Sequence, residues 1–167
     1  MTETILKMQK KVKRYLDKDR YDHTIGVMHT AGCLAMRYGA NLEQALTAGL
    51  LHDCAKCVPA DEKIKLCEKN HIEISDAEYK NPGLLHAKLG AFFARKKYGI
   101  ENEEILRSIE SHTTGRPNMS LLDKIIYIAD YIEPGRDVAP NLPEVRALAF
   151  VDIDACLYRI LEDTLAY

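Results

Sequence analysis

Residues 48–56 read Ala-Gly-Leu-Leu-His-Asp-Cys-Ala-Lys, so that an apolar helix end runs directly into an imidazole and a carboxylate. Because His52 and Asp53 are adjacent near a helix end, both side chains can turn toward one ion. Divalent transition metals accept this mixed set of nitrogen and oxygen ligands. Alone the pair is a weak signal, since it is equally typical of a histidine that caps a helix beside a solvated aspartate. The rest of the chain decides between the two interpretations.

Helical spacing of apolar residues recurs on both sides of this stretch, whereas the alternating Val/Ile/Thr runs that are typical of strands are few. Gly39 predicts a helix stop, Asn41 an N-cap, and Asp61 the cap of a short helix. We therefore predict one all-α domain over residues 1–167, a helical bundle of roughly eight to ten helices. The expected helices cover residues 5–19, 23–38, 42–51, 59–70, 84–98, 103–111, 120–132, 145–150 and 152–165.

Composition narrows the class of protein. The 23 Lys and Arg residues nearly balance the 25 Asp and Glu residues, which argues against a basic surface for nucleic acid. No apolar run approaches the ~18 residues of a membrane span, and the N-terminus does not resemble a secretory signal. Five irregularly spaced cysteines favour reduced thiols and a cytoplasmic location. An isologous homodimer is the base-rate expectation for assembly.

Four further residues are candidates to join the pair. His23 lies upstream, His86 follows a Pro-Gly turn, and His112 precedes Thr-Thr-Gly, where free amides and hydroxyls can hold an anion. Asp130 lies inside an apolar helix, where an unpaired charge costs several kcal/mol. It therefore needs a partner, which is either a metal or a salt bridge to one of the basic residues Lys124 and Arg136.

The ordered set His23, His52-Asp53, His86, His112 and Asp130 resembles the HD-domain metal phosphohydrolases. Flanking residues narrow the resemblance to the YqeK family, bacterial symmetrical bis(5′-nucleosyl)-tetraphosphatases, over nearly the whole chain. These flanks are Arg20-x-x-His23-Thr24, Leu50-Leu51-His52-Asp53-x-Ala55-Lys56, His112-Thr113-Thr114-Gly115 and Lys124-Ile125-x-Tyr127-x-Ala129-Asp130-Tyr131-Ile132-Glu133-Pro134-x-Arg136.

The resemblance implies a helical domain that binds iron and splits diadenosine tetraphosphate into two ADP. It implies a metal site and, around it, groups that act in catalysis or bind the phosphates. Imidazole and carboxylate also suit Mn, Co, Ni and Zn, and one or two ions are expected. The metal ligands would be His23, His52, Asp53 and Asp130, with His86 and His112 holding a second metal or phosphate. Catalytic roles would fall to Asp53, His86, His112 and Lys56, and substrate binding to Arg20, Lys56, His86, His112, Thr113, Thr114 and Arg136. The chain ends at Tyr167, earlier than the family leads us to expect, so nucleotide contacts from a longer tail are expected to be missing.

Two alternatives remain open at this point. The domain could be an HD phosphohydrolase of another nucleotide, such as a nucleoside monophosphate, a dNTP or a cyclic dinucleotide. It could also be a non-catalytic nucleotide sensor.

The cysteine pair, the two remaining histidines and Tyr131 are not expected to take part in metal binding or catalysis. The Cys54-x-x-Cys57 pair lacks a partner pair, so it is interpreted as two small apolar residues rather than a zinc knuckle or redox pair. His29 and His71 are expected to be incidental, and Tyr131 to pack in the core.

Overall fold

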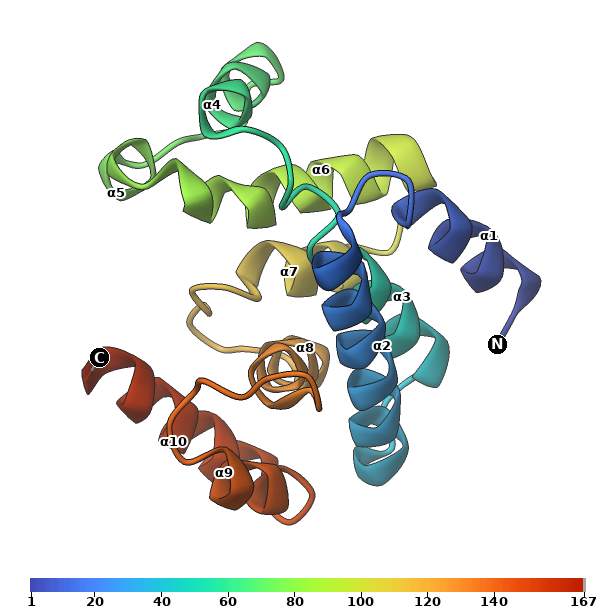
Figure 1. Cartoon of the computed structure of the whole chain (residues 1–167), viewed down its shortest axis with the longest axis vertical. Coiled ribbons are helices and arrows are strands. Elements are labelled where there is room, and N and C mark those ends of the chain that lie inside the picture. The colour runs from blue at the N-terminus through green and yellow to red at the C-terminus, as the bar shows by residue number, and fades with distance from the viewer. Residues whose placement is uncertain (167) are drawn as a thin grey trace.

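The fold of residues 1–166, which the computed structural model describes, consists of α-helices and one short 3₁₀ helix (Figure 1). This confirms the expected all-α class, and the ten α-helices found among these residues fall within the expected range. They are α1 (Glu3–Val12), α2 (Lys18–Tyr38), α3 (Leu42–Leu51), α4 (Ala60–Lys69), α5 (Asp76–Lys80), the 3₁₀ helix η1 (Pro82–Leu85), α6 (His86–Tyr98), α7 (Glu103–Ser111), α8 (Leu121–Ile132), α9 (Leu142–Ala149) and α10 (Ile153–Ala166).

Side-chain caps explain where several helices begin. Asn41 accepts from the Gln44 N–H at the start of α3, as expected. The helix expected from residue 23 begins earlier, because the Asp17 carboxylate caps α2 by accepting from the Arg20 N–H. His23 is therefore inside a helix, with a fixed orientation, instead of at a helix start.

Four other details differ from the expectation. The first helix, expected over residues 5–19, ends at Val12 and is followed by a turn before α2. Pro59 precedes α4 without a side-chain cap, so Asp61 is a first-turn residue that pairs with Lys65 rather than the N-cap. The five-residue helix α5 was not predicted, and its Ser75 capping box closes it locally. The helix α9 begins at Leu142, three residues before its expected start.

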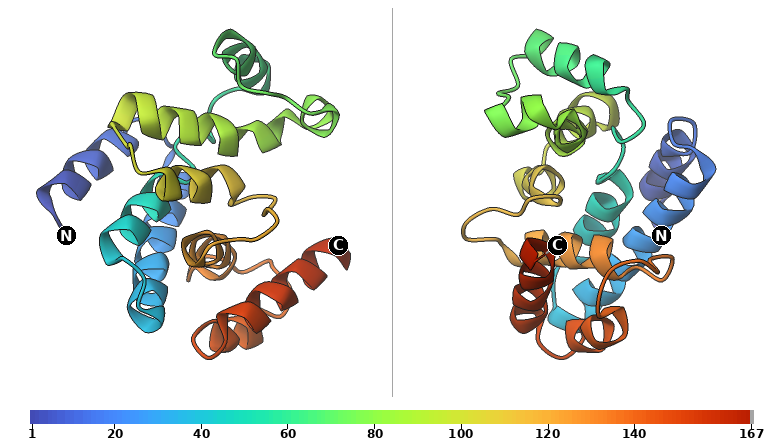
Figure 2. Two further views of the ribbon diagram at one scale, coloured as in Figure 1. Left: turned by 180° about the vertical axis from the view of Figure 1, so that it is seen from behind. Right: turned by 60° about the vertical axis from the view of Figure 1, so that its left-hand side comes forward.

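The centre of the fold is the antiparallel pair α2 and α3, against which α8 and α7 pack (Figures 1 and 2). A Cβ at Gly49 would lie 2.9 Å from the Met28 Cα, so the absence of a side chain lets α3 approach α2 closely. This approach brings the C-terminal end of α3 beside the N-terminal half of α2. On α8, Ile125, Ile126 and Ile128 are fully buried and each stabilises the fold by about 1.5–3 kcal/mol.

Two clusters of buried apolar residues flank the turn after α3. The larger one joins α1, α2, α3, α7, α8, α9, α10 and one face of α6, and the smaller one lies under α4, η1 and the rest of α6. Cys54 and Ala55 belong to the smaller cluster, so they anchor the turn that carries His52 and Asp53. Within residues 1–166, no helix combines the length and the apolar character that crossing a membrane requires.

Candidate metal centre

Four histidines and two aspartates that are far apart in the sequence lie together where α2, α3, α6, α7 and α8 meet. Each comes from a different helix or helix end, except the adjacent pair after α3. Their side chains are largely withdrawn from solvent. The structure brings together all six residues that the sequence analysis assigned to this site: His23, His52, Asp53, His86, His112 and Asp130.

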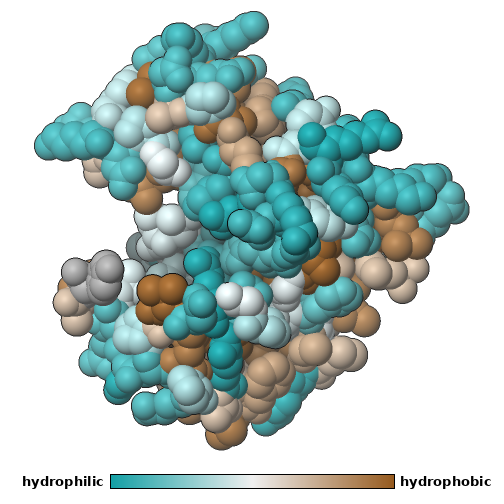
Figure 3. All heavy atoms as spheres, viewed as in Figure 1, coloured by the Kyte–Doolittle hydropathy of each residue, from teal (hydrophilic) through white to brown (hydrophobic). Residues whose placement is uncertain are grey.

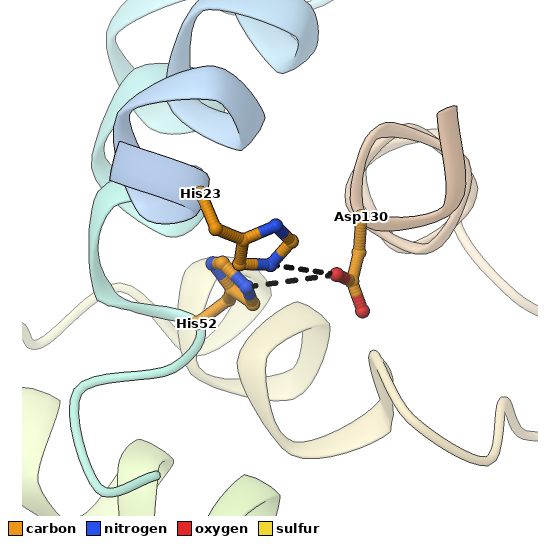
Figure 4. Close-up of side chains that lie close together, drawn as sticks. All are labelled: His23, His52 and Asp130. Atoms are coloured by element: carbon orange, nitrogen blue, oxygen red, sulfur yellow. Dashed lines mark ion pairs between the residues drawn. The ribbon is translucent and has the colours of Figure 1, made fainter. Parts of the chain in front are cut away.

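One group of ligand atoms is formed by His23, His52 and Asp130 (Figure 4). The Asp130 Oδ1 atom lies 3.0 Å from His23 Nε2 and 3.9 Å from His52 Nε2. In Figure 4 both imidazoles point across the gap between α2 and α8 toward this carboxylate. Two nitrogens and one oxygen thus face a common point.

Asp53 links this group to a second one. Its Oδ2 atom lies 3.6 Å from His52 Nε2 and 3.9 Å from His23 Nε2. Its Oδ1 atom lies 3.3 Å from His86 Nε2 and 3.5 Å from His112 Nε2. One carboxylate, only 2% exposed, therefore faces two pairs of imidazoles.

The other ring nitrogen of three of these histidines is held by a backbone carbonyl three residues earlier. The Nδ1 atoms of His52, His86 and His112 lie 2.6–2.7 Å from the carbonyl oxygens of Gly49, Gly83 and Ile109, respectively. A carbonyl only accepts, so each Nδ1 must donate its proton. The Nε2 atom of each neutral ring then presents its lone pair to the site, which is the form that binds a metal.

Three buried acceptor atoms of the site lack a donor. His23 Nε2, His52 Nε2 and Asp53 Oδ1 are buried without a hydrogen-bond partner, and the Nε2 atoms of His86 and His112 face each other at 3.1 Å. Buried acceptors that face one another are destabilising unless a cation lies among them. The residues therefore fit a divalent transition metal, whose preferred ligands are these nitrogens and carboxylate oxygens.

The charge states of His52 and of the two carboxylates agree with this donor set. Burial lowers the pKa of His52 to about 4, so its imidazole is neutral near pH 7. Burial opposes ionisation of Asp53 and Asp130, but the imidazoles around them outweigh it and hold the pKa of both carboxyls below its usual value. Burial opposes protonation of His112, but the Asp53 and Asp130 carboxylates outweigh it and raise the pKa of this ring, so a metal would have to displace its proton. Neutral imidazoles and ionised carboxylates are the protonation states that a metal requires.

Residues 20–135 match the family model described as "HD domain". All six ligand-type residues lie within this span. The chain belongs to the HD-domain family. Membership implies that the chain binds a divalent metal ion, in agreement with the donor set of these six residues, which form the HD site.

Two curated relatives each align with 93% of this HD-domain chain. Both are named "Bis(5'-nucleosyl)-tetraphosphatase, symmetrical". The protein from Bacillus subtilis is 41% identical over 83% of its own length, and the protein from Halalkalibacterium halodurans is 44% identical over 82%. A crystal structure from Clostridium acetobutylicum, described as a predicted HD superfamily hydrolase involved in NAD metabolism, has a TM-score of 0.92 and 44% identity. It covers 96% of this chain and 84% of the other.

Basic side chains surround the ligands of the HD site. Arg20 Nη1 lies 3.0 Å from Asp53 Oδ2, and Arg136 Nη2 lies 2.7 Å from Asp130 Oδ1. Lys56 Nζ lies 3.2 Å from His86 Nε2 and 3.9 Å from the Asp53 carboxylate. Of the two salt-bridge partners considered for Asp130, Arg136 makes the contact. The other one, Lys124, pairs with Asp154 instead.

The two threonines after His112 differ in position. Thr113 Oγ1 lies 3.1 Å from the Nε2 atoms of both His86 and His112. Thr114 is exposed, its hydroxyl donates to the Gly115 carbonyl, and it does not line the cleft over the metal centre. The structure therefore brings Thr113 to the HD site and leaves Thr114 outside it.

A cleft of about 780 Å³ opens above the metal centre. Figure 3 shows a hollow at the left of the view, between the upper helices and the C-terminal helices. Tyr131 was expected in the core, but it packs partly against the core and also lines this cleft. The walls carry both signs of charge, and the lining residues include Asp17, Asp19, Arg20, His23, Lys56, His112, Thr113, Asp130, Glu133, Arg136 and Asp137.

Glu133 is the site residue that the sequence analysis missed. It is 3% exposed, and its Oε1 atom lies 3.0 Å from His23 Nδ1, while Oε2 accepts from the Gly135 N–H at 2.6 Å. Glu133 thus holds the Nδ1 atom of His23, as backbone carbonyls hold the Nδ1 atoms of the other three histidines. A Cβ at Gly26, one turn along α2 from His23, would lie under 3.0 Å from this carboxylate. In the sequence, the Pro-Gly that follows Glu133 is typical of an exposed turn, and this hid its role.

The remaining histidines and the cysteine pair lie outside the ligand set. His29 and His71 are exposed, as expected. Cys54 is buried and its thiol contacts the Gly90 carbonyl, in agreement with a small apolar role. Cys57 is exposed and lies 3.5 Å from Asp17 Oδ2, so the apolar interpretation is wrong for this residue.

Proposed function

We propose that the protein is a metal-dependent hydrolase that splits diadenosine tetraphosphate symmetrically into two ADP. The observation that carries the proposal is the Asp53 carboxylate, which faces two pairs of imidazoles at the base of a cleft with basic walls. Two relatives at 41% and 44% identity carry the name of this activity. A small nucleotide is therefore the substrate that both lines of support favour.

In this proposal His23, His52, Asp53 and Asp130 hold the metal, and His86 and His112 hold a second ion or contact phosphate. A bound divalent ion would polarise a phosphoryl oxygen and lower the pKa of its water to about 7. We propose iron as the native metal, with Mn, Co, Ni and Zn as chemically acceptable substitutes.

The chain's own side chains position the tetraphosphate. Lys56 reaches the second imidazole pair with its Nζ atom, where it can donate to an inner phosphate. Arg20 and Arg136 now pair with the ligand carboxylates, and their remaining N–H groups can bind phosphate in a bidentate manner. Thr113 can donate its hydroxyl to the same phosphates.

The proposed reaction consumes only water and the dinucleotide. Water forms a bond to one of the two inner phosphorus atoms, and the bond from that phosphorus to the central bridging oxygen breaks. The departing ADP keeps the electron pair, and one proton is released. Because the transition state spreads negative charge over the phosphoryl oxygens, the basic walls stabilise it more than the substrate.

Product identification tests the proposal. The purified protein should be loaded with iron, manganese or cobalt, incubated with diadenosine tetraphosphate, and its products separated by anion-exchange chromatography. ADP should be the sole nucleotide product. Formation of ATP together with AMP would refute symmetrical cleavage, and an absence of turnover with every metal would refute the activity and favour a nucleotide sensor.

The cellular setting follows from composition. We propose that the protein acts in the cytoplasm, since its five cysteines are all free in the structure. We also propose that it works as one domain, assembles as an isologous homodimer, and does not bind nucleic acid. Size-exclusion chromatography with light scattering would decide the assembly state.

A further inference from the structure

A second pocket lies on the other side of the turn that carries Lys56. Its volume is about 450 Å³, within the range of small-molecule sites. It is enclosed by the segment between α1 and α2, the segment between α3 and α4, helix α4 and the C-terminal half of α6. Four of the residues that line this aromatic pocket carry aromatic rings, and Glu62 and Lys97 are charged.

Aromatic rings dominate this lining. Phe92, Phe93 and Tyr98 come from α6, and Tyr15 faces them from the segment after α1, with 55% of its surface exposed. Lys97 Nζ lies over the Phe93 ring, 3.3 Å from its centroid, and 5.7 Å from the Tyr15 centroid. Flat rings beside a cation favour a planar, electron-rich ligand such as a nucleobase.

The aromatic pocket adjoins the cleft over the metal centre. Cys57 lines the pocket, Asp17 lines the cleft, and their side chains are 3.5 Å apart. The residue before Cys57 is Lys56, whose Nζ atom lies 3.2 Å from His86 Nε2. The cleft and the aromatic pocket therefore meet at the turn that carries Lys56 and Cys57.

The proposed substrate carries a nucleoside at each end of its phosphate chain. Symmetrical cleavage requires the central bridging oxygen at the metal centre, so an ADP half extends from it in each direction. The large cleft accommodates one half. We propose that the aromatic pocket binds the base of the second nucleoside, an inference that rests on the proposed function. Asp17 and Glu62 supply acceptors for the hydroxyls and amino group of that nucleoside.

A comparison of two substrates tests the inference. Diadenosine tetraphosphate and adenosine tetraphosphate share the phosphate chain, but only the first has a second nucleoside. Replacement of Tyr15 by Ala should lower the ratio of kcat/KM for the dinucleotide to that for the mononucleotide by about 5- to 150-fold, the effect of losing one stacked base. If the mononucleotide is not turned over, the reciprocal of its inhibition constant replaces its kcat/KM in the ratio.

Two variants control for structural effects. Tyr15→Phe keeps the ring and should show the wild-type substrate ratio. A folding defect would instead lower the turnover of both substrates alike and leave their ratio unchanged. Tyr158 is 65% exposed on α10, outside both pockets, and Tyr158→Ala should leave the ratio as in the wild type.

A photolabelling experiment gives a readout without turnover. A dinucleotide with azidoadenine bases should label peptides of α6 in addition to the walls of the cleft, and Tyr15→Ala should reduce the α6 label alone. Equal effects of Tyr15→Ala on both substrates, or labelling confined to the cleft, would overturn the inference. Wild-type protein that does not form ADP from the dinucleotide would instead refute the proposed function.

Discussion

Replacement of Glu133 by Gln should weaken metal binding at the HD site by about 10- to 100-fold while the helices stay folded. The Glu133 carboxylate accepts two hydrogen bonds, from His23 Nδ1 at 3.0 Å and from the Gly135 N–H at 2.6 Å. A carboxamide of the same size has only one oxygen, so its amino group must oppose one of these donors. An unpaired buried donor costs about 1–3 kcal/mol.

The orientation of the carboxamide determines which donor is lost. If its amino group faces His23, the ring must accept at Nδ1 and carry its proton on Nε2, where it blocks the lone pair aimed at the metal. If its amino group faces Gly135, the segment after α8 loses its anchor. The first arrangement affects metal binding directly, because Nε2 of His23 lies 3.0 Å from Asp130.

Gly26→Ala perturbs the same contact without a change of charge. Its new Cβ would lie under 3.0 Å from the Glu133 carboxylate and should displace it from His23. In most helix interiors a change from Gly to Ala stabilises the helix by about 0.5–1 kcal/mol. Weaker metal binding by Gly26→Ala would therefore not arise from helix propensity.

Metal affinity should be measured by isothermal titration with manganese into metal-free protein, with circular dichroism and thermal unfolding on the same samples. Excess metal should restore the activity of Glu133→Gln, which a purely structural defect would not allow. Wild-type metal affinity in both Glu133→Gln and Gly26→Ala would refute the role of Glu133 in positioning His23.

Four other outcomes follow from the site. Asp53→Ala should abolish turnover and metal binding with little loss of helical content by circular dichroism, because it removes the carboxylate shared by all four imidazoles; an active variant would contradict the ligand assignment. Lys56→Ala should lower kcat/KM by about 10- to 100-fold through the loss of one charged hydrogen bond, with metal content by elemental analysis unchanged. His29→Ala and His71→Ala should match the wild type in metal content and kcat, and a loss in either would show that the ligand set is incomplete. Chelation of the metal should weaken ADP binding measured by titration calorimetry, and equal affinity in both forms would refute metal-assisted phosphate binding.

Local rules account for the parts of the fold that the sequence predicted well. The bounds of α7 match the expected range, because Asn102 caps it and an apolar stripe runs along one face. Ser120 likewise marks the start of α8. The start of α2 was missed, since its first turn, Lys18-Asp19-Arg20, is polar and precedes the apolar stripe. The helix α5 has no buried residue, so no periodic pattern could indicate it.

The residues of the candidate site also divide into those that the sequence predicted and those that it did not. The ligand-type residues were found because histidines and aspartates beside apolar helices are conspicuous. Glu133 was missed because its role depends on a contact across 110 positions of the chain, which no local pattern encodes. The exposure of Cys57 and the position of Thr114 outside the cleft depend equally on how the turns pack. Patterns of residue type thus predict which groups can bind a metal, whereas the contacts that orient them require the fold.

The near-zero net charge of the chain argues against a long nucleic acid as partner, yet the proposed substrate is a polyanion. The walls of the cleft resolve this conflict. They bring Arg20, Lys56 and Arg136 together with the carboxylates of Asp53 and Asp130, so the protein alone provides little excess positive charge for a phosphate chain. A divalent ion is the largest local charge in such a site. It would neutralise the carboxylates of Asp53 and Asp130, which now form ion pairs with the basic groups. Metal binding would then release Arg20 and Arg136 for phosphate, so the same ion that activates the reaction also prepares the cleft for its substrate.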